Sequence, residues 1–500
     1  MNPSRLVIGF SVAIAGLLAV LLMGRSKPGT AAGRPLLVYC AAGLKVPVEE
    51  VAREYERRTG VPVQLQFGGS GLLLNNLQVV RRGDLFVAAD STFLDAGRAN
   101  GLVDEILPLA RMQAVIVTPR DNPKKLRTLQ DLTQPGVQIA FANPDAAAIG
   151  FLCRQVLERS NAWTSLQPRI KVLKPTVNDV ANDVKLGTVD AGIVWDAVAG
   201  TYPELAAHRD PTLESVTAGV GIGVLSFTGQ PTAALRFARF LCARDAGLPV
   251  LASHGYTVAE GDAWSEHPEI VLYSGDVNRV AIEDTLRQFE EREGVSISRV
   301  YNGGDILTAQ IQSGQRPDAY FAGDVSFMTP VHSYFQPSTV LSETRILILT
   351  QPGNPKGIRS LDDLAQAGLS LGIANEQQSA LGILTRRLLD AENLSARILP
   401  NVRVRTPTAD LLVNQMRAGG LDAALVYAAN VSPVRGQLGI VELPQPLALV
   451  QQPFAVGRDS QNTRLMERLR ERLRSTESRR HFEDLGFRWR DTASASASTR

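Results

Sequence analysis

Short apolar runs alternate with amphipathic stretches along most of the chain. Residues 36–42, 61–67 and 84–90 are short runs rich in apolar and β-branched residues, typical of buried strands. Residues 48–58 and 72–80 lie between them and have the spacing of helices with one apolar face. Strands that alternate with helices predict right-handed βαβ units and the α/β class, with mixed, mostly parallel sheets flanked by helices.

The same order of segments occurs a second time, 234 positions later at first and 232 positions later farther along. The matching pairs, in chain order, are 36–43 with 270–277, 67–71 with 301–305, 84–94 with 318–328, 139–150 with 371–382 and 187–195 with 419–427. So many matches in one order indicate a tandem duplication of a unit of about 230 residues.

The repeat sets the expected domain organisation. We expect an N-terminal targeting segment with a linker at 1–35, a first unit at 36–260, a second unit at 268–490 and a disordered tail at 491–500.

The N-terminal segment is apolar and lies between basic residues. Residues 6–23 carry no charged side chain, Arg5 precedes them, and Arg25 and Lys27 follow. This pattern is typical of a cleaved export signal or of an uncleaved membrane anchor, and both alternatives stay open. In either case the folded units are expected to be periplasmic or extracytoplasmic, associated with the inner membrane if residues 6–23 remain as an anchor.

Composition narrows the classes of partner and chemistry. The chain has 52 basic and 50 acidic residues, a net charge of +2, and only 6% aromatic residues, so we expect no nucleic-acid partner. Three scattered cysteines and five histidines show no metal-ligand spacing, so no metal and no cofactor is expected. Cys40 is predicted to be a small buried residue; the alternative is a nucleophile.

The glycine-rich turn FGGSG, residues 67–71, lies between a predicted strand and a predicted helix. A helix that begins there leaves its first backbone N–H groups without intrahelical partners, and Ser70 adds a hydroxyl. The turn lacks the lysine of a nucleotide-binding loop. It therefore predicts either an anion site or simple helix capping by Ser70.

Three further strand-to-helix junctions have the same character. Residues 39–43, 146–150 and 175–179 present small residues at predicted helix starts, with no cation nearby. Several neutral N–H donors that converge on one crevice would suit a tetrahedral oxyanion.

Other polar residues have ordinary structural interpretations. Asp90 and Asp324 each follow a predicted strand and precede a helix, so both are predicted to be N-caps. The arginine-rich stretch 464–480 has Leu465, Leu469 and Leu473 at helical spacing and predicts one amphipathic closing helix. Contact of this helix with acidic lipid head groups is the alternative.

The motifs of the first unit together resemble a known family. LLVYCAAGL, FGGSGLL, GDLFVAAD, FANPDAAAIG, VNDVANDVKLGTVDAGIVW and HGYTV are similar, in this order, to the periplasmic molybdate-binding proteins of ABC importers. The resemblance implies two tandem units of the type II periplasmic-binding-protein fold, each a "Venus flytrap" of two lobes. It also implies capture of a small oxyanion, molybdate or tungstate-like, and delivery to an ABC permease.

The resemblance also implies ligand-binding positions. The family's first-turn serine falls on Gly43, its second-turn serine on Ser70 and its tyrosine on Trp195. Backbone donors fall on Ile149 and Val177. Gly43 lacks the hydroxyl, and the indole of Trp195 can donate a hydrogen bond but cannot accept one.

The second unit departs further from this pattern and is more similar to the iron-type solute receptors of the same fold. The equivalents of the five positions are Val277, Gly304, Leu381, Ala409 and Tyr427. Asp276 and Asp305 place carboxylates near the expected crevice and would repel an oxyanion. Tyr427 is followed by alanine, not by the second tyrosine common in ferric sites. A degenerate, non-binding repeat is the alternative.

Two function classes follow. The leading hypothesis is an extracytoplasmic solute-binding protein for an ABC transporter; the alternative is a membrane-tethered sensory or scaffold protein with degenerate solute-binding units. No Ser-His-Asp set, metal spacing or nucleotide loop supports an enzyme.

Overall fold

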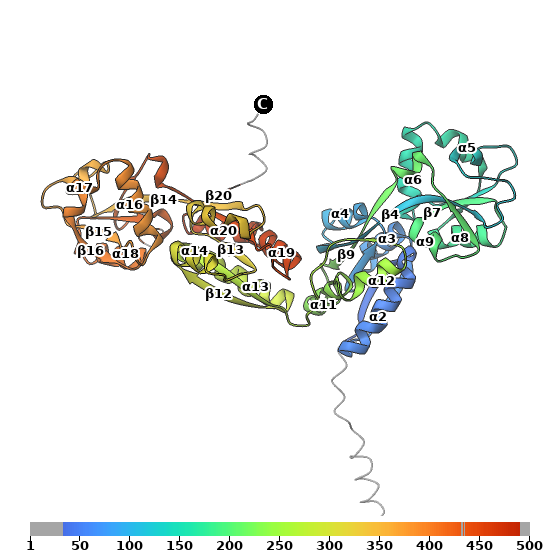
Figure 1. Cartoon of the computed structure of the whole chain (residues 1–500), viewed down its shortest axis with the longest axis horizontal. Helices are drawn as coiled ribbons and strands as arrows, with labels where there is room; N and C mark the ends of the chain where they lie inside the picture. The colour runs from blue at the N-terminus through green and yellow to red at the C-terminus, as the bar shows by residue number, and fades with distance from the viewer. Residues whose placement is uncertain (1–33, 432–433, 435, 491–500) are drawn as a thin grey trace, which may run out of the picture. The chain divides into compact units, whose positions relative to one another are not determined.

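The chain divides into two compact units, the first ending at Glu260 and the second beginning at Gly261 (Figure 1). The structure, a computed structural model, describes residues 34–431, 434 and 436–490. The apolar segment at 6–23 and the tail at 491–500 lie outside these described residues. Among the helices of the described ranges, none combines the length and apolarity needed to span a membrane.

The first unit contains a ten-stranded mixed sheet. Its main path runs β2-β1-β3-β9-β4-β7-β5-β6, with β8 and β10 paired to β4. The strands are β1 (Leu36–Ala41), β2 (Val63–Gly68), β3 (Leu85–Ala88), β4 (Val103–Pro119), β5 (Ile139–Ala142), β6 (Ile170–Lys174), β7 (Ala191–Trp195), β8 (Leu205–His208), β9 (Thr217–Leu225) and β10 (Thr257–Val258).

Helices cover the two ends of this sheet as separate groups. In Figure 1, α2, α11 and α12 lie together at one end of the unit, and α5, α6 and α8 lie at the other. The helices are α2 (Lys45–Thr59), α3 (Ser70–Val80), α4 (Ser91–Ala99), α5 (Leu129–Leu132), α6 (Ala148–Arg159), α7 (Trp163–Leu166), α8 (Val177–Lys185), α9 (Asp196–Gly200), α10 (Pro211–Glu214), α11 (Pro231–Leu241) and α12 (Gly247–Ser253).

The long strand β4 joins two lobes. Its first part pairs antiparallel with β9, next to the parallel set β3-β1-β2, and its last part pairs antiparallel with β7, next to the parallel set β5-β6. The first lobe therefore holds β1, β2, β3 and β9, and the second holds β5, β6, β7 and β8. The carboxyl ends of parallel strands are where ligand crevices form in such sheets.

The second unit repeats this topology. Its path β12-β11-β13-β19-β14-β17-β15-β16 matches that of the first unit strand for strand, which confirms the duplication and the fold class predicted from the sequence. Its strands are β11 (Glu269–Gly275), β12 (Ser296–Asn302), β13 (Ala319–Phe321), β14 (Thr339–Thr350), β15 (Leu371–Ala374), β16 (Val402–Thr406), β17 (Ala423–Tyr427), β18 (Gly439–Glu442), β19 (Leu449–Val456) and β20 (Arg488–Trp489). Its α-helices are α13 (Arg279–Glu293), α14 (Gly304–Gln312), α15 (Val325–Met328), α16 (Ala380–Ala391), α17 (Ser395–Ile398), α18 (Ala409–Arg417), α19 (Thr463–Leu473) and α20 (Thr476–Asp484).

A buried aspartate next to the start of β3 connects distant segments of the first unit by hydrogen bonds. Asp84 is 5% exposed and accepts hydrogen bonds from the backbone N–H of Leu37 at 2.8 Å, the hydroxyl of Thr228 at 2.6 Å and the amide of Gln230 at 3.2 Å. Asp318 accepts equivalent bonds in the second unit, from the backbone of Val271 and the side chains of Ser460 and Asn462. The duplication thus preserved a three-way polar anchor.

The predicted N-caps are confirmed. The Asp90 carboxylate accepts from the N–H of Thr92, and that of Asp324 accepts from the N–H of Ser326. Each aspartate also accepts from a neighbouring strand, Asp90 from Gly219 and Asp324 from Gln451. Both carboxylates therefore fix a helix start to the sheet.

Cys40 is a core residue, as predicted. It lies in β1 with no exposed surface, and burial raises the pKa of its thiol. A thiol that stays protonated in the core of a sheet is a poor nucleophile, which disfavours the alternative interpretation.

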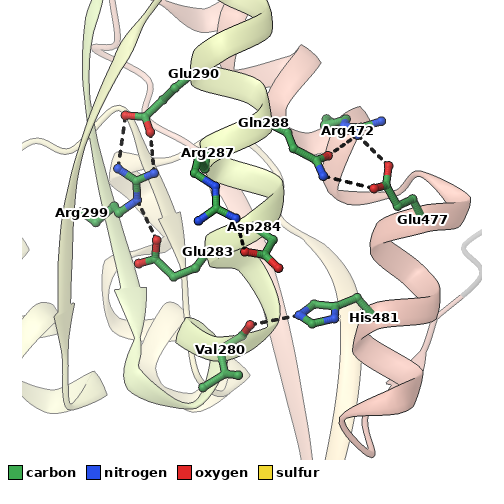
Figure 2. A network of polar contacts seen from close by, with 10 residues as sticks. All are labelled: Val280, Glu283, Asp284, Arg287, Gln288, Glu290, Arg299, Arg472, Glu477 and His481. Carbon is green, nitrogen blue, oxygen red and sulfur yellow. Dashed lines mark hydrogen bonds and ion pairs between the residues drawn. The ribbon is translucent and has the colours of Figure 1, made fainter.

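The prediction of one closing helix at 464–480 is wrong. Ser475 interrupts it, because its backbone is extended (φ −61°, ψ 155°) and its hydroxyl caps α20 at the N–H of Ser478. The leucines of α19 are buried as expected. Figure 2 shows one arginine of this stretch in contact with other parts of the second unit: Arg472 donates hydrogen bonds to Gln288 of α13 and to Glu477 of α20.

Candidate functional site

The glycine-rich turn begins α3 two residues earlier than predicted. Gly69 is the N-cap residue and Ser70 is the first residue of the helix, so Ser70 is not the cap. The Ser70 side chain is 1% exposed, and its oxygen accepts the N–H of Ala89 at 3.1 Å. Because this bond uses a lone pair, the hydroxyl proton of Ser70 is left to donate.

The structure brings the five positions of the first unit together around one small cavity. The space open to the centre of a water molecule is about 20 Å³, which suits an ion or a few atoms and excludes a large solute. The lining residues are Ala41, Ala42, Gly43, Gly68, Gly69, Ser70, Ala89, Ala147, Ala148, Ile149, Thr176, Val177 and Trp195.

The cavity wall is uncharged and includes, besides the start of α3, two helix starts of the second lobe. Helix α6 begins at Ala148, and the side chain of its N-cap residue, Ala147, makes no capping hydrogen bond. Helix α8 begins at Val177. The first N–H groups of a helix have no intrahelical acceptor and carry partial positive charge. Ala148, Ile149 and Val177 line the cavity at these helix starts, so their N–H groups are the candidate donors, and none of the described lining residues has a charged side chain.

Gly43 and Trp195 lie close to each other. Trp195 ends β7 and is 1% exposed. A Cβ atom on Gly43 would lie 3.2 Å from Cγ1 of Val177 and 3.5 Å from Cδ1 of Trp195. The contact with Trp195 would be an ordinary van der Waals contact, whereas the contact with Val177 would be tight, so a side chain at position 43 requires Val177 to shift slightly.

Tyr256 was not predicted as part of this site. Its hydroxyl donates a hydrogen bond to the carbonyl of Gly43, and burial raises the pKa of the phenol, which keeps it protonated as a donor. The HGYTV motif marked this residue in the sequence, but no local pattern linked it to the first turn. The bond fixes the backbone conformation at Gly43 next to the cavity.

The two lobes touch at the glycine-rich turn. The carbonyl of Ala146, in the second lobe, accepts the N–H groups of Gly71 at 3.0 Å and Leu72 at 3.2 Å. The expectation that the first N–H groups of this helix are unpaired is thus wrong for these two. A Cβ on Gly69 would lie 2.7 Å from the carbonyl oxygen of Pro175 and closer still to that of Ala146. Only glycine permits this approach.

Comparison with known families decides the class of the protein. The family model described as bacterial extracellular solute-binding protein matches residues 36–257 and, again, residues 270–488. The chain belongs to this family.

This solute-binding protein is also similar to individual proteins. The molybdate-binding protein ModA of Mycobacterium tuberculosis is 29% identical over 253 residues, which are 49% of this chain and 93% of the relative. Among solved structures, the match to the Azotobacter vinelandii periplasmic molybdate-binding protein covers 45% of this chain and the full length of that protein, with 20% identity and a TM-score of 0.41. The match to iron-bound HitA from Pseudomonas aeruginosa covers 45% of this chain and 85% of HitA, with 18% identity and a TM-score of 0.37.

In the second solute-binding unit, the counterparts of the first unit's site residues are packed in a hydrophobic core. Leu381, Ala409 and Tyr427 belong to one buried hydrophobic cluster, and Val277 packs against it. Asp276 and Asp305 are themselves exposed, at the start of the short helix Asp276–Asn278 and in the first turn of α14.

The Tyr427 hydroxyl is buried and has no hydrogen-bond partner within the described part of the chain. Burial, followed by the carboxylates of Asp324 and Asp276, raises its pKa. This side of the second crevice therefore offers a neutral phenol close to negative charge, an unfavourable place for an anion.

Proposed function

We propose that the first unit captures a small tetrahedral oxyanion outside the cytoplasmic membrane, with molybdate and tungstate as the leading candidates. The observation that carries this proposal is the uncharged cavity in which the Ser70 hydroxyl and the starts of α6 and α8 meet.

The donor set favours a fully ionised anion. Such an ion offers only acceptors, and the cavity presents a hydroxyl proton and backbone N–H groups. In a site shielded from water, hydrogen bonds to a charged acceptor are stronger than neutral ones. The small volume and the indole of Trp195 set the size limit, so selection among tetrahedral anions would rest on their radius.

Transport is the role that we propose for this capture. A relative at 29% identity is named as a molybdate-binding protein, and the family is one of extracellular solute-binding proteins. Closure of two lobes over the ligand would create the surface that an ABC permease recognises.

Calorimetry of the full chain with molybdate, tungstate, sulfate and phosphate tests the proposal. We expect the first two to bind with measurable heat and the smaller sulfate and phosphate to bind much more weakly. No heat with any of the four would contradict an oxyanion function.

The Ser70→Ala substitution tests the role of the hydroxyl. Loss of one hydrogen bond to a charged ligand typically costs about 1.5–3 kcal/mol, so we expect roughly 10- to 100-fold weaker binding of molybdate. Ser91→Ala, at an exposed serine that begins α4, is the matched control and should bind normally. Equal affinity of the Ser70 variant and wild type would remove Ser70 from the site.

A further inference from the structure

In the second unit, one aromatic side chain crosses from the first lobe into the second. Phe327 lies in α15, which packs beside α14 and β19 of the first lobe. Its side chain is 3% exposed and belongs to the hydrophobic cluster of the second lobe, together with Leu381, Ala409 and Tyr427. A residue of one lobe thus completes the core of the other.

Phe327 takes the place that the Ser70 side chain occupies in the first unit. Gly304 is the counterpart of Ser70, and a Cβ there would lie 2.7 Å from Cδ1 of Phe327 and closer still to two other ring atoms. The ring therefore lies directly on the helix start. Even an alanine at position 304 would displace it.

The equivalent phenylalanine of the first unit behaves differently. Phe93 is half-buried and packs against the hydrophobic cluster of its own lobe, which includes Leu94 and Leu74. Its ring also meets Phe151 of α6, in the second lobe, edge-on, with ring centroids 5.9 Å apart. Phe93 is not among the residues that line the cavity beside Ser70, whereas Phe327 lies directly on the equivalent helix start at Gly304.

Polar contacts hold Phe327 in place from both lobes. The Thr308 hydroxyl donates to the carbonyls of Gly304 and Phe327, which fixes α15 on α14. Arg387, in α16 of the second lobe, donates to the Ser326 hydroxyl at 2.8 Å, and its guanidinium lies 5.8 Å from the centre of the Phe327 ring. The counterparts of Ser326 and Arg387 in the first unit are Thr92 and Gln155, so the first unit lacks this cation.

We propose that Phe327 is a built-in occupant of the second crevice and that, with Arg387 at its rim, it keeps the two lobes of this unit closed without a solute. The second unit then binds no small oxyanion, and the chain takes up one ion rather than two. This inference concerns a different unit from the proposed oxyanion site and does not depend on it.

Hydrogen exchange of the full chain, without any added anion, tests the closure. Phe327→Ala should increase exchange at least about tenfold in peptides that cover the starts of α16 and α18, because the lobes lose their shared apolar contact. Arg387→Ala should produce a smaller increase of about two- to fivefold, since a partly exposed cation–π contact is weak. Val325→Ala, on the exposed side of α15, and Arg386→Ala, whose ion pairs stay within the second lobe, are the matched controls.

Unchanged exchange in both the Phe327 and the Arg387 variants would overturn the proposal, and so would equal increases in the controls. Calorimetry with molybdate also counts the sites, and we expect one ion per chain. Binding of a second ion that is lost in Gly304→Ser but kept in Ser70→Ala would also overturn the proposal. If molybdate does not bind at all, the oxyanion function fails while the exchange result still decides whether the second unit is closed.

Discussion

Replacement of Gly69 by alanine is expected to lower the affinity for molybdate at least about 100-fold, the equivalent of about 2.7 kcal/mol or more. The added Cβ would collide with the carbonyl oxygens of Ala146 and Pro175, which belong to the opposite lobe. The backbone of Gly69 itself (φ −70°, ψ 144°) is one that alanine adopts freely. The substitution therefore opposes closure of the lobes and leaves the fold of each lobe intact.

Gly200→Ala is the matched control, since a Cβ at that position meets nothing within 4 Å. Isothermal calorimetry gives the affinities, and thermal unfolding without ligand should show nearly the same midpoint for wild type and both variants. Full binding by the Gly69 variant would contradict the view that this turn must meet the second lobe. A large loss of stability without ligand would assign Gly69 to folding instead.

Removal of the Asp84 carboxylate is expected to destabilise the first unit by about 3 kcal/mol, because three donors lose a buried acceptor at once. Asp84→Ala leaves the N–H of Leu37, the hydroxyl of Thr228 and the amide of Gln230 without that partner. Denaturant titration measures the loss of stability, and hydrogen exchange of individual peptides shows which unit has lost it.

The duplicated anchor supplies an internal comparison. Asp318→Ala should destabilise the second unit in the same way and leave peptides of the first unit unchanged, whereas Asp95→Ala, at an exposed position of α4, should change neither. A change of less than about 1 kcal/mol for both Asp84 and Asp318 would show that these anchors are replaceable.

The fold was predictable because it depends on patterns that are local and repeated. Apolar runs such as 36–42 become strands, the turns after them become helix starts, and the second copy repeats the order. Gly43, Ser70, Ile149, Val177 and Trp195 were expected at one crevice because of the resemblance to the molybdate-binding family. The structure places each of them at or after the carboxyl end of a strand, where such crevices form.

The remaining features depend on contacts between distant segments. The carbonyl of Ala146 approaches Gly69 only when the lobes meet, and no sequence pattern near either residue predicts this contact. Phe93 and Phe327 occupy the same position in similar sequences, STFL and VSFM, and both rings contact the opposite lobe. Phe93 is only partly buried and does not line the cavity beside Ser70, whereas Phe327 is buried directly on the helix start at Gly304. The difference arises from Gly304, whose missing side chain gives the ring its space.

The hydrogen bond from Tyr256 to Gly43 has a consequence for the order of events during synthesis of the chain. Its two residues are 213 positions apart, one near the start of the first unit and one at its end. A nascent chain that has emerged only as far as β9 lacks Tyr256 and cannot fix the Gly43 backbone. The cavity should therefore take its final form only after nearly the whole first unit has been synthesised.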